Sequence, residues 1–376
     1  MKKITIIFSF LFALFLLNSC DIDGLNDTNL TTSESGNLNK IFDISTDNTG
    51  AVKITPTGEG ASKFVVLFGH GSGANSSATL LPGQNAVHNY PEGNYTVTIK
   101  SYDLAGKETV NTYPLKVTFV APTDLAANTD LGAHTLNLSV KAKYAMGGFL
   151  VYFGDVTNEV GTSIAAGTPD SNSFINGGPI THTYAAPGTY TLKVVALSGG
   201  AAQTVSTQTI RVYDAYSLPI TYDDPNQNYG IGGVFGGVDA AVVANPFSGG
   251  LNTSANVWKF TKNAGAASWA GTWTPIAAPN GVPINIDNGS KFKMLVYATE
   301  TGKSLHFQLE QPSSGIGNQS VDVPITVANG WQELTFDFGT LGIPAGTTFK
   351  QIVFQYNLAG DGTGEVIYID NVRQTN

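Results

Sequence analysis

The chain has 376 residues, a length that predicts two or three domains at ~100–200 residues each. Only 12% of the residues are charged, against the ~25% typical of soluble domains, while 42% are hydrophobic, which is enough for several cores. The formal net charge is −9 and no Lys/Arg cluster follows Lys2 and Lys3. A nucleic-acid partner is therefore not expected, because binding to a phosphate backbone needs a basic patch.

The first residues have the pattern of a signal peptide, which we place at 1–19. An apolar run from 4 to 17 follows the two lysines and is too short to span a membrane as a helix. It ends at Leu17-Asn18-Ser19-Cys20, and Cys20 is the only cysteine, so an intrachain disulfide is excluded. This motif resembles the lipobox of bacterial lipoproteins, which implies a lipid on Cys20. The alternative is an ordinary secretion signal that ends at an unmodified cysteine.

Polar residues follow the cysteine and predict a flexible tether over residues 20–39, rich in Gly, Ser, Thr and Asn. Asp21 and Asp23 come at its start. They resemble the export signal of Bacteroidetes-type lipoproteins. The resemblance implies an outer-membrane protein that faces the cell exterior.

Residues 40–119 and 120–214 each show short β-branched or aromatic runs between turn residues, the pattern of β-strands. In 94–102, Tyr95, Val97 and Ile99 alternate with polar residues, as in a half-buried antiparallel strand. The predicted strands of the two segments are 52–57, 63–68, 94–102 and 113–120, then 136–143, 148–154, 189–197 and 208–214. We expect one β-sandwich in each segment.

The two segments also align with each other. Phe68 and Phe153 are 85 positions apart, and Tyr95 and Tyr190 are 95 apart, so the second copy has longer loops. Both copies contain an aromatic-Gly turn, then His-x-Tyr, then Gly-x-Tyr. This order resembles PKD-type immunoglobulin-like domains, in which these residues are mostly structural. We therefore interpret His88 and His182 as braces of turns. The first copy departs from the family at His70, where an Asp is usual, and its role is left open.

Residues 215–376 form the longest segment and show no amphipathic helix. Eight predicted strands and long loops indicate a jelly-roll sandwich. The strands are expected at 256–263, 269–276, 291–299, 304–311, 320–327, 331–338, 350–357 and 365–372. The fold class predicted for the whole chain is all-β, with two tandem immunoglobulin-like sandwiches followed by a C-terminal jelly roll.

The third segment resembles a second family through a series of motifs. They are Tyr222-Asp223-Asp224, Asn245-Pro246, Gly250-Leu251-Asn252-Thr253-Ser254, Trp269-Ala270-Gly271, the run from Gly330 to Phe338, and Tyr368-Ile369-Asp370-Asn371-Val372. Their order is similar to that of the jelly-roll carbohydrate-binding modules of Bacteroidetes surface proteins, often attached to laminarinase-type hydrolases. The resemblance implies glycan binding, with β-1,3-glucan (laminarin) as the expected ligand.

The same resemblance implies a structural calcium ion that joins the first strand to the last. Its expected ligands are Asp223 and Asp370, with Asp224 or Asn245 nearby. Calcium takes ~6–8 oxygen ligands, and carboxylates are suitable donors. Ordinary turn and cap carboxylates are the alternative interpretation.

Strand alternation selects the residues expected to contact a glycan. With Leu305, Phe307 and Leu309 directed to the core, His306 and Gln308 lie on the other face. The same argument turns Tyr297 outward in 291–299.

Among the four tryptophans, Trp273 is the first choice for stacking on sugar, and Trp269 either stacks or packs. We interpret Trp258 and Trp331 as structural. Tyr229 and Phe235 flank glycines in a predicted loop and either meet the ligand or fold over the sandwich edge.

Catalytic motifs are missing from the sequence. It has no G-x-S-x-G, Walker A, H-E-x-x-H or C-x-x-C motif, and within residues 215–376 Glu310 with Glu333 is the one carboxylate pair suited to glycoside hydrolysis. We therefore predict a non-catalytic surface glycan-binding lipoprotein. By resemblance, its partners would be a TonB-dependent importer, a partner surface glycan-binding protein and hydrolases. A structural or adhesive protein and a divergent hydrolase are the alternatives.

Overall fold

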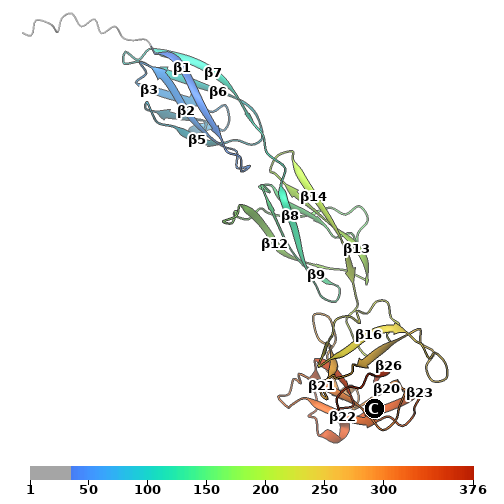
Figure 1. Cartoon of the computed structure of the whole chain (residues 1–376). Helices are drawn as coiled ribbons and strands as arrows, with labels where there is room; N and C mark the ends of the chain where they lie inside the picture. The colour runs from blue at the N-terminus through green and yellow to red at the C-terminus, as the bar shows by residue number, and fades with distance from the viewer. Residues whose placement is uncertain (1–34) are drawn as a thin grey trace, which may run out of the picture. The chain divides into compact units, whose positions relative to one another are not determined.

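The computed structural model of the chain describes residues 35–376 (Figure 1). The predicted signal peptide, Cys20 and most of the tether lie outside these residues. The described part consists of β-strands with three short 3-10 turns, which confirms the all-β fold class. It contains no helix long and apolar enough to cross a membrane. Two compact units are distinguished, one of residues up to 120 with 198–202, the other of 121–197 with 203–376.

The first unit contains a sandwich of a three-stranded and a four-stranded sheet. Their strands are β1 (Gly36–Ile44), β2 (Ala51–Glu59) and β5 (Ala86–Asn89), and β4 (Ser77–Leu80), β3 (Lys63–Leu67), β6 (Gly93–Tyr102) and β7 (Glu108–Val117). The turn η1 (Gly73–Ser76) leads into β4. Alternate residues of β6, including Val97 and Ile99, are fully buried in the core, as the alternation predicts.

The second unit begins with a sandwich of the same kind, again with a three-stranded and a four-stranded sheet. Its strands are β8 (Thr123–Leu131), β9 (Thr135–Lys143) and β12 (Phe174–Thr183), and β11 (Thr162–Ile164), β10 (Gly148–Tyr152), β13 (Gly188–Leu197) and β14 (Gln203–Val212). Phe149 and Leu192 belong to its separate core. The internal repeat inferred from the sequence thus corresponds to two sandwiches of similar topology.

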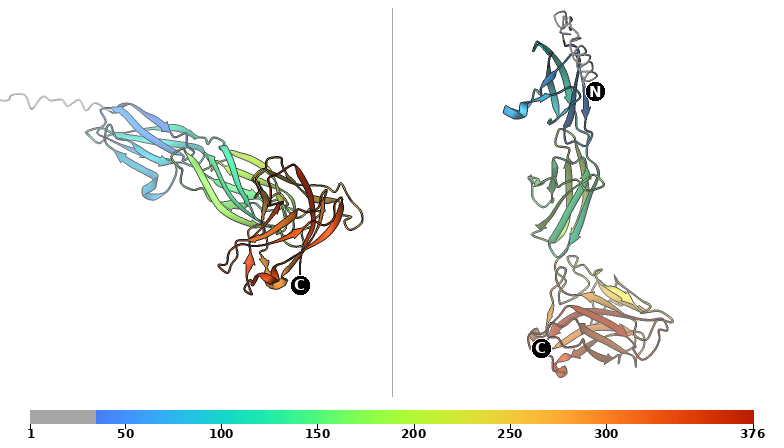
Figure 2. Two further views of the ribbon diagram at one scale, coloured as in Figure 1. Left: turned by 60° about the horizontal axis from the view of Figure 1, so that its bottom comes forward. Right: turned by 90° about the vertical axis from the view of Figure 1, so that its left-hand side faces the viewer.

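The C-terminal sandwich packs two five-stranded sheets face to face (Figure 2). One sheet has the order β15 (Gly233–Phe235), β18 (Gly271–Pro275), β25 (Gln351–Tyr356), β21 (Ser304–Glu310) and β22 (Gln319–Pro324). The other has the order β16 (Val238–Ala244), β17 (Asn256–Lys262), β26 (Glu365–Thr375), β20 (Lys291–Ala298) and β23 (Gly330–Asp337). The small pair β19 (Ile284–Asn285) and β24 (Thr348–Phe349), with the turns η2 (Ile286–Asn288) and η3 (Phe338–Leu341), completes it.

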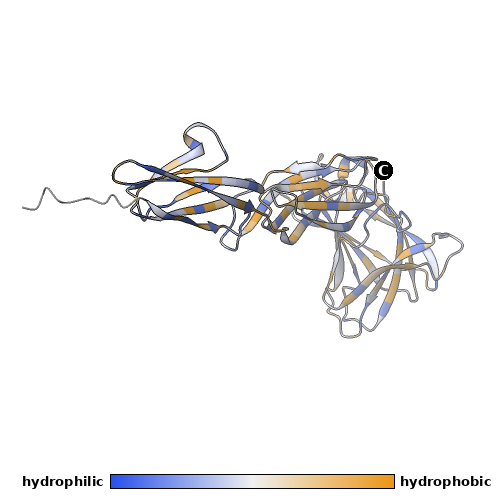
Figure 3. Ribbon diagram, turned by 90° about the horizontal axis from the view of Figure 1, so that it is seen from above, coloured by the Kyte–Doolittle hydropathy of each residue, from blue (hydrophilic) through white to orange (hydrophobic). Residues whose placement is uncertain are grey.

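Hydrophobic and polar residues alternate along many strands, as the bands of Figure 3 show. In β21 the core side chains are Leu305, Phe307 and Leu309, all fully buried, as predicted. A strand has a period of two, so the residues between them face away from the core. This alternation creates the outward face on which the candidate site lies.

A lysine is buried inside the C-terminal sandwich. Lys262, at the end of β17, is fully buried, and its Nζ donates hydrogen bonds to the carbonyl oxygens of Ser268, Tyr356, Asn357 and Gly360. A buried ammonium is costly unless its donors are satisfied, and here they are. Burial lowers the pKa of Lys262. The bond to Ser268 fixes the residue before Trp269.

The structure has strands that the sequence pattern did not indicate. Examples are β1, which begins at Gly36 inside the predicted tether, and β16, whose small residues lack a clear alternation. The strand predicted at 269–276 begins only at Gly271, so Trp269 lies in the preceding loop. Trp269 and Trp273 therefore do not lie on the same strand.

Candidate functional site

The outward face of the sheet β15-β18-β25-β21-β22, hereafter the β21 face, carries most of the predicted glycan-binding residues. Cross-strand partners share a face, so the register assigns its rows. One row contains Phe235, Gly271, Gln355, His306 and Asp322. The next row contains Gly233, Trp273, Val353, Gln308 and Ser320. A third contains Pro275, Gln351 and Glu310.

Polar side chains form a connected ladder along β21. The Nδ1 of His306 lies 3.1 Å from Oδ1 of Asp322, and its Nε2 lies 3.2 Å from Oε1 of Gln308. The Gln308 amide donates to Glu310, which also accepts from the amide of Gln351. Residues at i, i+2 and i+4 of a strand are ~6.6 and ~13 Å apart, so this ladder is as long as a short oligosaccharide. Held amides of this kind offer both donors and acceptors to a ligand.

Three aromatic rings of this region lie over glycines. A Cβ built on Gly233 would be only 2.8 Å from Nε1 of Trp273, and one built on Gly271 would be 2.7 Å from Cζ of Phe235. The indole of Trp273 and the ring of Phe235 can approach the backbone this closely because those positions have no side chain. The rings thus form flat surfaces against the sheet.

The third ring belongs to Trp269, which is 58% exposed. It is nearly parallel to the ring of Phe235, with centroids 6.1 Å apart and an interplanar angle of 10°. A Cβ on Gly236 would be 3.0 Å from its Cζ3. Its carbonyl oxygen accepts a hydrogen bond of 2.5 Å from the amide of Gln355 on the β21 face. Trp269 and Phe235 thus form an exposed aromatic pair beside the amide side chains of the β21 face.

Tyr297 lies elsewhere. Its strand, β20, belongs to the other sheet, so the outward direction inferred from alternation leads to the opposite side of the sandwich. There the ring stacks on Phe247 with centroids 3.9 Å apart, touches Trp331 and Tyr368, and is only 7% exposed. Alternation correctly predicted that Tyr297 points away from the core, but it could not predict to which sheet the strand belongs. Tyr297 is therefore not part of the β21 face.

Trp331 is structural, as expected. Its Nε1 donates a 2.9 Å hydrogen bond to the carbonyl of Phe247, which holds the loop after β16 over the second sheet. The neighbouring Glu333 is bound by Lys293 and Arg373. These contacts lower the pKa of Glu333, the hydrogen bond from Lys293 being the largest cause. Glu310 and Glu333 consequently lie on opposite sheets and do not flank one cleft.

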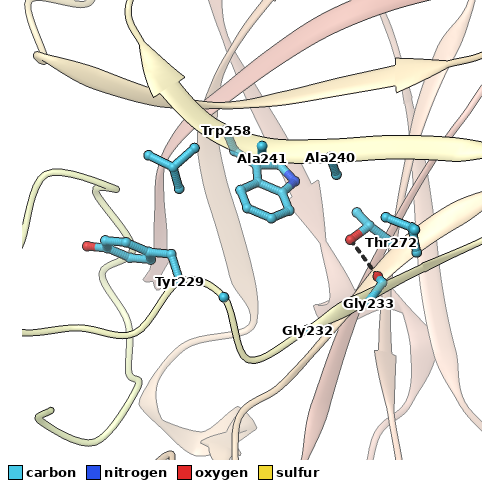
Figure 4. Close-up of a pocket in the computed structure, with 10 residues that line it drawn as sticks. Tyr229, Gly232, Gly233, Ala240, Ala241, Trp258 and Thr272 are labelled. Atoms are coloured by element: carbon cyan, nitrogen blue, oxygen red, sulfur yellow. Dashed lines mark hydrogen bonds between the residues drawn. The ribbon is translucent and has the colours of Figure 1, made fainter. Parts of the chain in front are cut away.

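Tyr229 lines a separate cleft of about 410 Å³ at the edge of the sandwich, between β15 and β16 (Figure 4). The indole of Trp258 lies in it between Tyr229 and Thr272, and the glycines 230, 232 and 233 form part of the wall. One side of the Trp258 ring packs on Tyr222, at 5.6 Å and 16°. Thr272 faces this cleft and Trp273, its neighbour, faces away, so β18 separates the edge cleft from the β21 face.

The residues predicted to bind calcium form two groups. Asp370, fully buried in β26, accepts from the amide of Asn252, and burial raises its pKa, with a contribution from the charge of Asp223. Asp223 accepts from the backbone of Ala255 and Asn256. The other two predicted ligands have local partners: Asp224 accepts from Asn226, and Asn245 accepts from Phe247.

Asp223 and Asp370 therefore fit a calcium site better than Asp224 or Asn245 does. Two carboxylates supply only part of the ~6–8 oxygens that calcium takes. Within residues 35–376 no cluster of three His, Cys, Asp or Glu side chains is arranged for a metal ion. The remaining oxygens would have to come from loop carbonyls such as those near Asn252, and calcium stays a prediction.

Three polar residues of the β21 face were missed by the sequence reasoning, namely Gln351, Gln355 and Asp322. Alternation in 350–357 could have found the two glutamines, since they alternate with Ile352, Phe354 and Tyr356, which are buried. What the sequence lacked was the register that brings β25 between β18 and β21. Without the register, the sequence does not show that the glutamines lie between Trp273 and Gln308 on the sheet.

Comparisons with known proteins found similarity to solved structures only. No family model and no curated protein matches the chain. The similar solved structures include carbohydrate-binding modules of the β-sandwich superfamily (15% identity, TM-score 0.28), aligned over 68% of this chain and 99% of that one.

Two others have a bound ligand in their description. A family 11 carbohydrate-binding module from Clostridium thermocellum, in complex with a β-1,3-1,4-mixed-linked tetrasaccharide, is 14% identical (TM-score 0.29) over 41% of this chain and 95% of its own. TmCBM61, in complex with β-1,4-galactotriose, is 15% identical (TM-score 0.26) over 39% of this chain and 88% of its own. Because these TM-scores are low, the ligand of this chain has to be proposed from its own residues.

Proposed function

We propose that this protein binds polysaccharide on the β21 face of its C-terminal sandwich and does not act on it chemically. The observation that carries the proposal is the combination of flat aromatic rings over glycines with a ladder of amide side chains beside them. A pyranose ring has an apolar C–H face and a hydroxyl rim, so it needs both kinds of surface in contact. Neither kind alone would distinguish a glycan from another ligand.

Binding would use Trp273 as the central platform. The negative face of an indole attracts the C–H groups of a sugar, and the ring loses little conformational entropy because Gly233 already allows it to lie flat. Gln308 stands two strands away in the same row, and Gln351 and Gln355 stand between them in the neighbouring rows. These amides would donate to and accept from the hydroxyls. The affinity is expected to be modest, because hydroxyls must lose water before they bind.

The charges on the β21 face favour a neutral glycan. Its two carboxylates, Asp322 and Glu310, would repel sulfate or uronate groups, and the formal net charge of the chain is −9. We propose a β-1,3-glucan such as laminarin, following the resemblance of the motifs in the third segment. Other neutral β-glucans are the nearest competitors.

The location and partners that we propose follow from the N-terminal sequence. Lipidation of Cys20 would anchor the chain to the outer membrane facing the exterior, and the two PKD-like sandwiches would act as spacers. The bound polysaccharide would then be passed to a TonB-dependent importer, with a partner surface glycan-binding protein and hydrolases. A structural calcium ion at Asp223 and Asp370 is part of the proposal.

Affinity gel electrophoresis of the purified chain without residues 1–20 tests the function. We expect laminarin, and neutral β-glucans more generally, to retard migration, while sulfated and uronate-containing polysaccharides do not. If no polysaccharide retards the protein, glycan binding is refuted and a structural or adhesive role takes its place. Release of reducing sugar from the retarding glycan would refute the non-catalytic part and favour a hydrolase.

A further inference from the structure

The first sandwich contains a histidine pair that the proposed glycan function does not use. His70 lies in the turn after β3 and His88 lies in β5, and the Nδ1 of His70 is 3.0 Å from the Nε2 of His88. Both side chains are half-buried. Both line a cleft of about 730 Å³ together with residues of η1 and β5. The pair is therefore held by the fold and accessible from solvent.

Aromatic neighbours fix both imidazole rings. His88 stacks on Phe68, with centroids 4.3 Å apart and an interplanar angle of 13°. The ring of His70 meets Tyr95 edge-on at 5.5 Å. Each ring can rotate little, which lowers the entropy cost of binding an ion between the two nitrogens.

In the second sandwich the equivalent position contains a His–Asp pair instead of two histidines. There His182 stacks on Phe153 in the same way, at 3.8 Å and 5°, but its Nε2 lies 2.8 Å from a carboxylate oxygen of Asp155. The aromatic stack is thus common to both sandwiches, and the fold accepts Asp or His as the partner. In the first sandwich the partner supplies a second imidazole nitrogen instead of a charge.

We propose that His70 and His88 together bind a divalent transition-metal ion such as Zn²⁺ or Ni²⁺, with water in the remaining coordination positions. Metal–nitrogen distances are ~2.0–2.1 Å, so two neighbouring ligands of one ion lie about 2.9–3.4 Å apart. The observed separation of 3.0 Å falls in this range. Imidazole suits these ions, whereas calcium and magnesium prefer oxygen.

Both nitrogens can bind one ion, because a neutral imidazole carries its single proton on either ring nitrogen. The nitrogen that donates the present hydrogen bond would bind the ion after its proton moves to the other nitrogen of the same ring. No proton is released overall. The cleft leaves room for the water ligands.

Isothermal titration of tag-free protein with Zn²⁺ and Ni²⁺ chloride tests the site. We expect one equivalent to bind to the wild type, and the affinity of His70→Asn to be at least tenfold weaker, because Asn can keep the hydrogen bond to His88 but is a poor ligand. His134→Asn, in the second sandwich, is the matched control and should bind as the wild type does. His88→Gln repeats the test should the first variant fail to fold, as judged by thermal melting.

Absence of binding to the wild type overturns the proposal. So does equal affinity of the wild type and folded His70→Asn or His88→Gln, since the ion would then lie elsewhere. Neither result depends on whether the C-terminal sandwich binds glycan.

Discussion

The two five-stranded sheets of the C-terminal sandwich both carry aromatic residues on their outward faces, yet they use them differently. On the second sheet, Tyr297 packs on Trp331 and on Phe247 of the loop after β16, and Trp331 donates a hydrogen bond to the carbonyl of Phe247. On the β21 face, Trp273 and Phe235 pack on glycines. Phe235 is also stacked with the exposed Trp269, whereas Trp273 stacks on no other aromatic ring within residues 35–376. An aromatic residue marks a ligand site only where the fold leaves its ring face available.

The largest expected effect is that of Trp273→Ala on glycan binding. Removal of the central platform should weaken binding by about 2 kcal/mol, roughly 30-fold, as for a central hot-spot residue. The midpoint of thermal unfolding should change little, because the ring lies on the outside of the sheet. Affinity electrophoresis and thermal melting measure the two quantities. If the variant is retarded as strongly as the wild type, Trp273 does not contact the glycan, and the two sheets do not differ in the way proposed.

Trp331→Ala is expected to lower the stability of the C-terminal sandwich and to leave glycan binding unchanged. The variant loses the hydrogen bond to Phe247 and the contact with Tyr297, so the free energy of unfolding should fall by about 2 kcal/mol, a decrease of ~4–8 °C in melting temperature for a domain of this size. Glycan affinity should stay as in the wild type. A loss of affinity in the folded variant would mean that ligand also contacts the second sheet.

Calcium should act on stability alone. Asp370 lies in β26 of the second sheet, so an ion there would stabilise the sandwich away from the β21 face. At ten times its Kd, calcium would add about 1.4 kcal/mol to the free energy of unfolding. Melting curves with calcium and with EDTA measure this, and Asp370→Asn should abolish the difference. Identical curves under both conditions would refute the ion, while loss of glycan binding in EDTA would place it in the glycan site.

The smallest effect is expected for Gln308→Ala. Loss of one amide that bonds to hydroxyls should weaken binding by about 1 kcal/mol, roughly fivefold, without a change in stability. Gln374→Ala is a matched control, because this glutamine lies on β26 and bonds to Asn285 and Gly289. Electrophoresis of both variants against the same glycan is the measurement. Equal affinities would mean that the ladder is not in contact with the ligand.

Much of the candidate site was predicted from alternation within single strands. Leu305, Phe307 and Leu309 are buried as expected, so His306 and Gln308 face away from the core, although the neighbours of His306 leave it only 7% exposed. The prediction failed where the pattern did not say which sheet a strand joins, and Tyr297 is the example. It also missed β16 and the start of β18, because small residues such as Ala and Gly give no clear period.

The all-β class, the internal repeat and the side chains that face away from each core could be read from the order of the residues alone. These properties depend on local spacing, which a strand converts directly into direction. Three sets of contacts depend on the folded chain: Trp273 lies over Gly233, Gln351 and Gln355 lie beside Gln308, and His70 contacts His88. Those contacts join residues that are 18 or more positions apart in the chain, and their closeness depends on strand order and register, which spacing along one strand cannot encode.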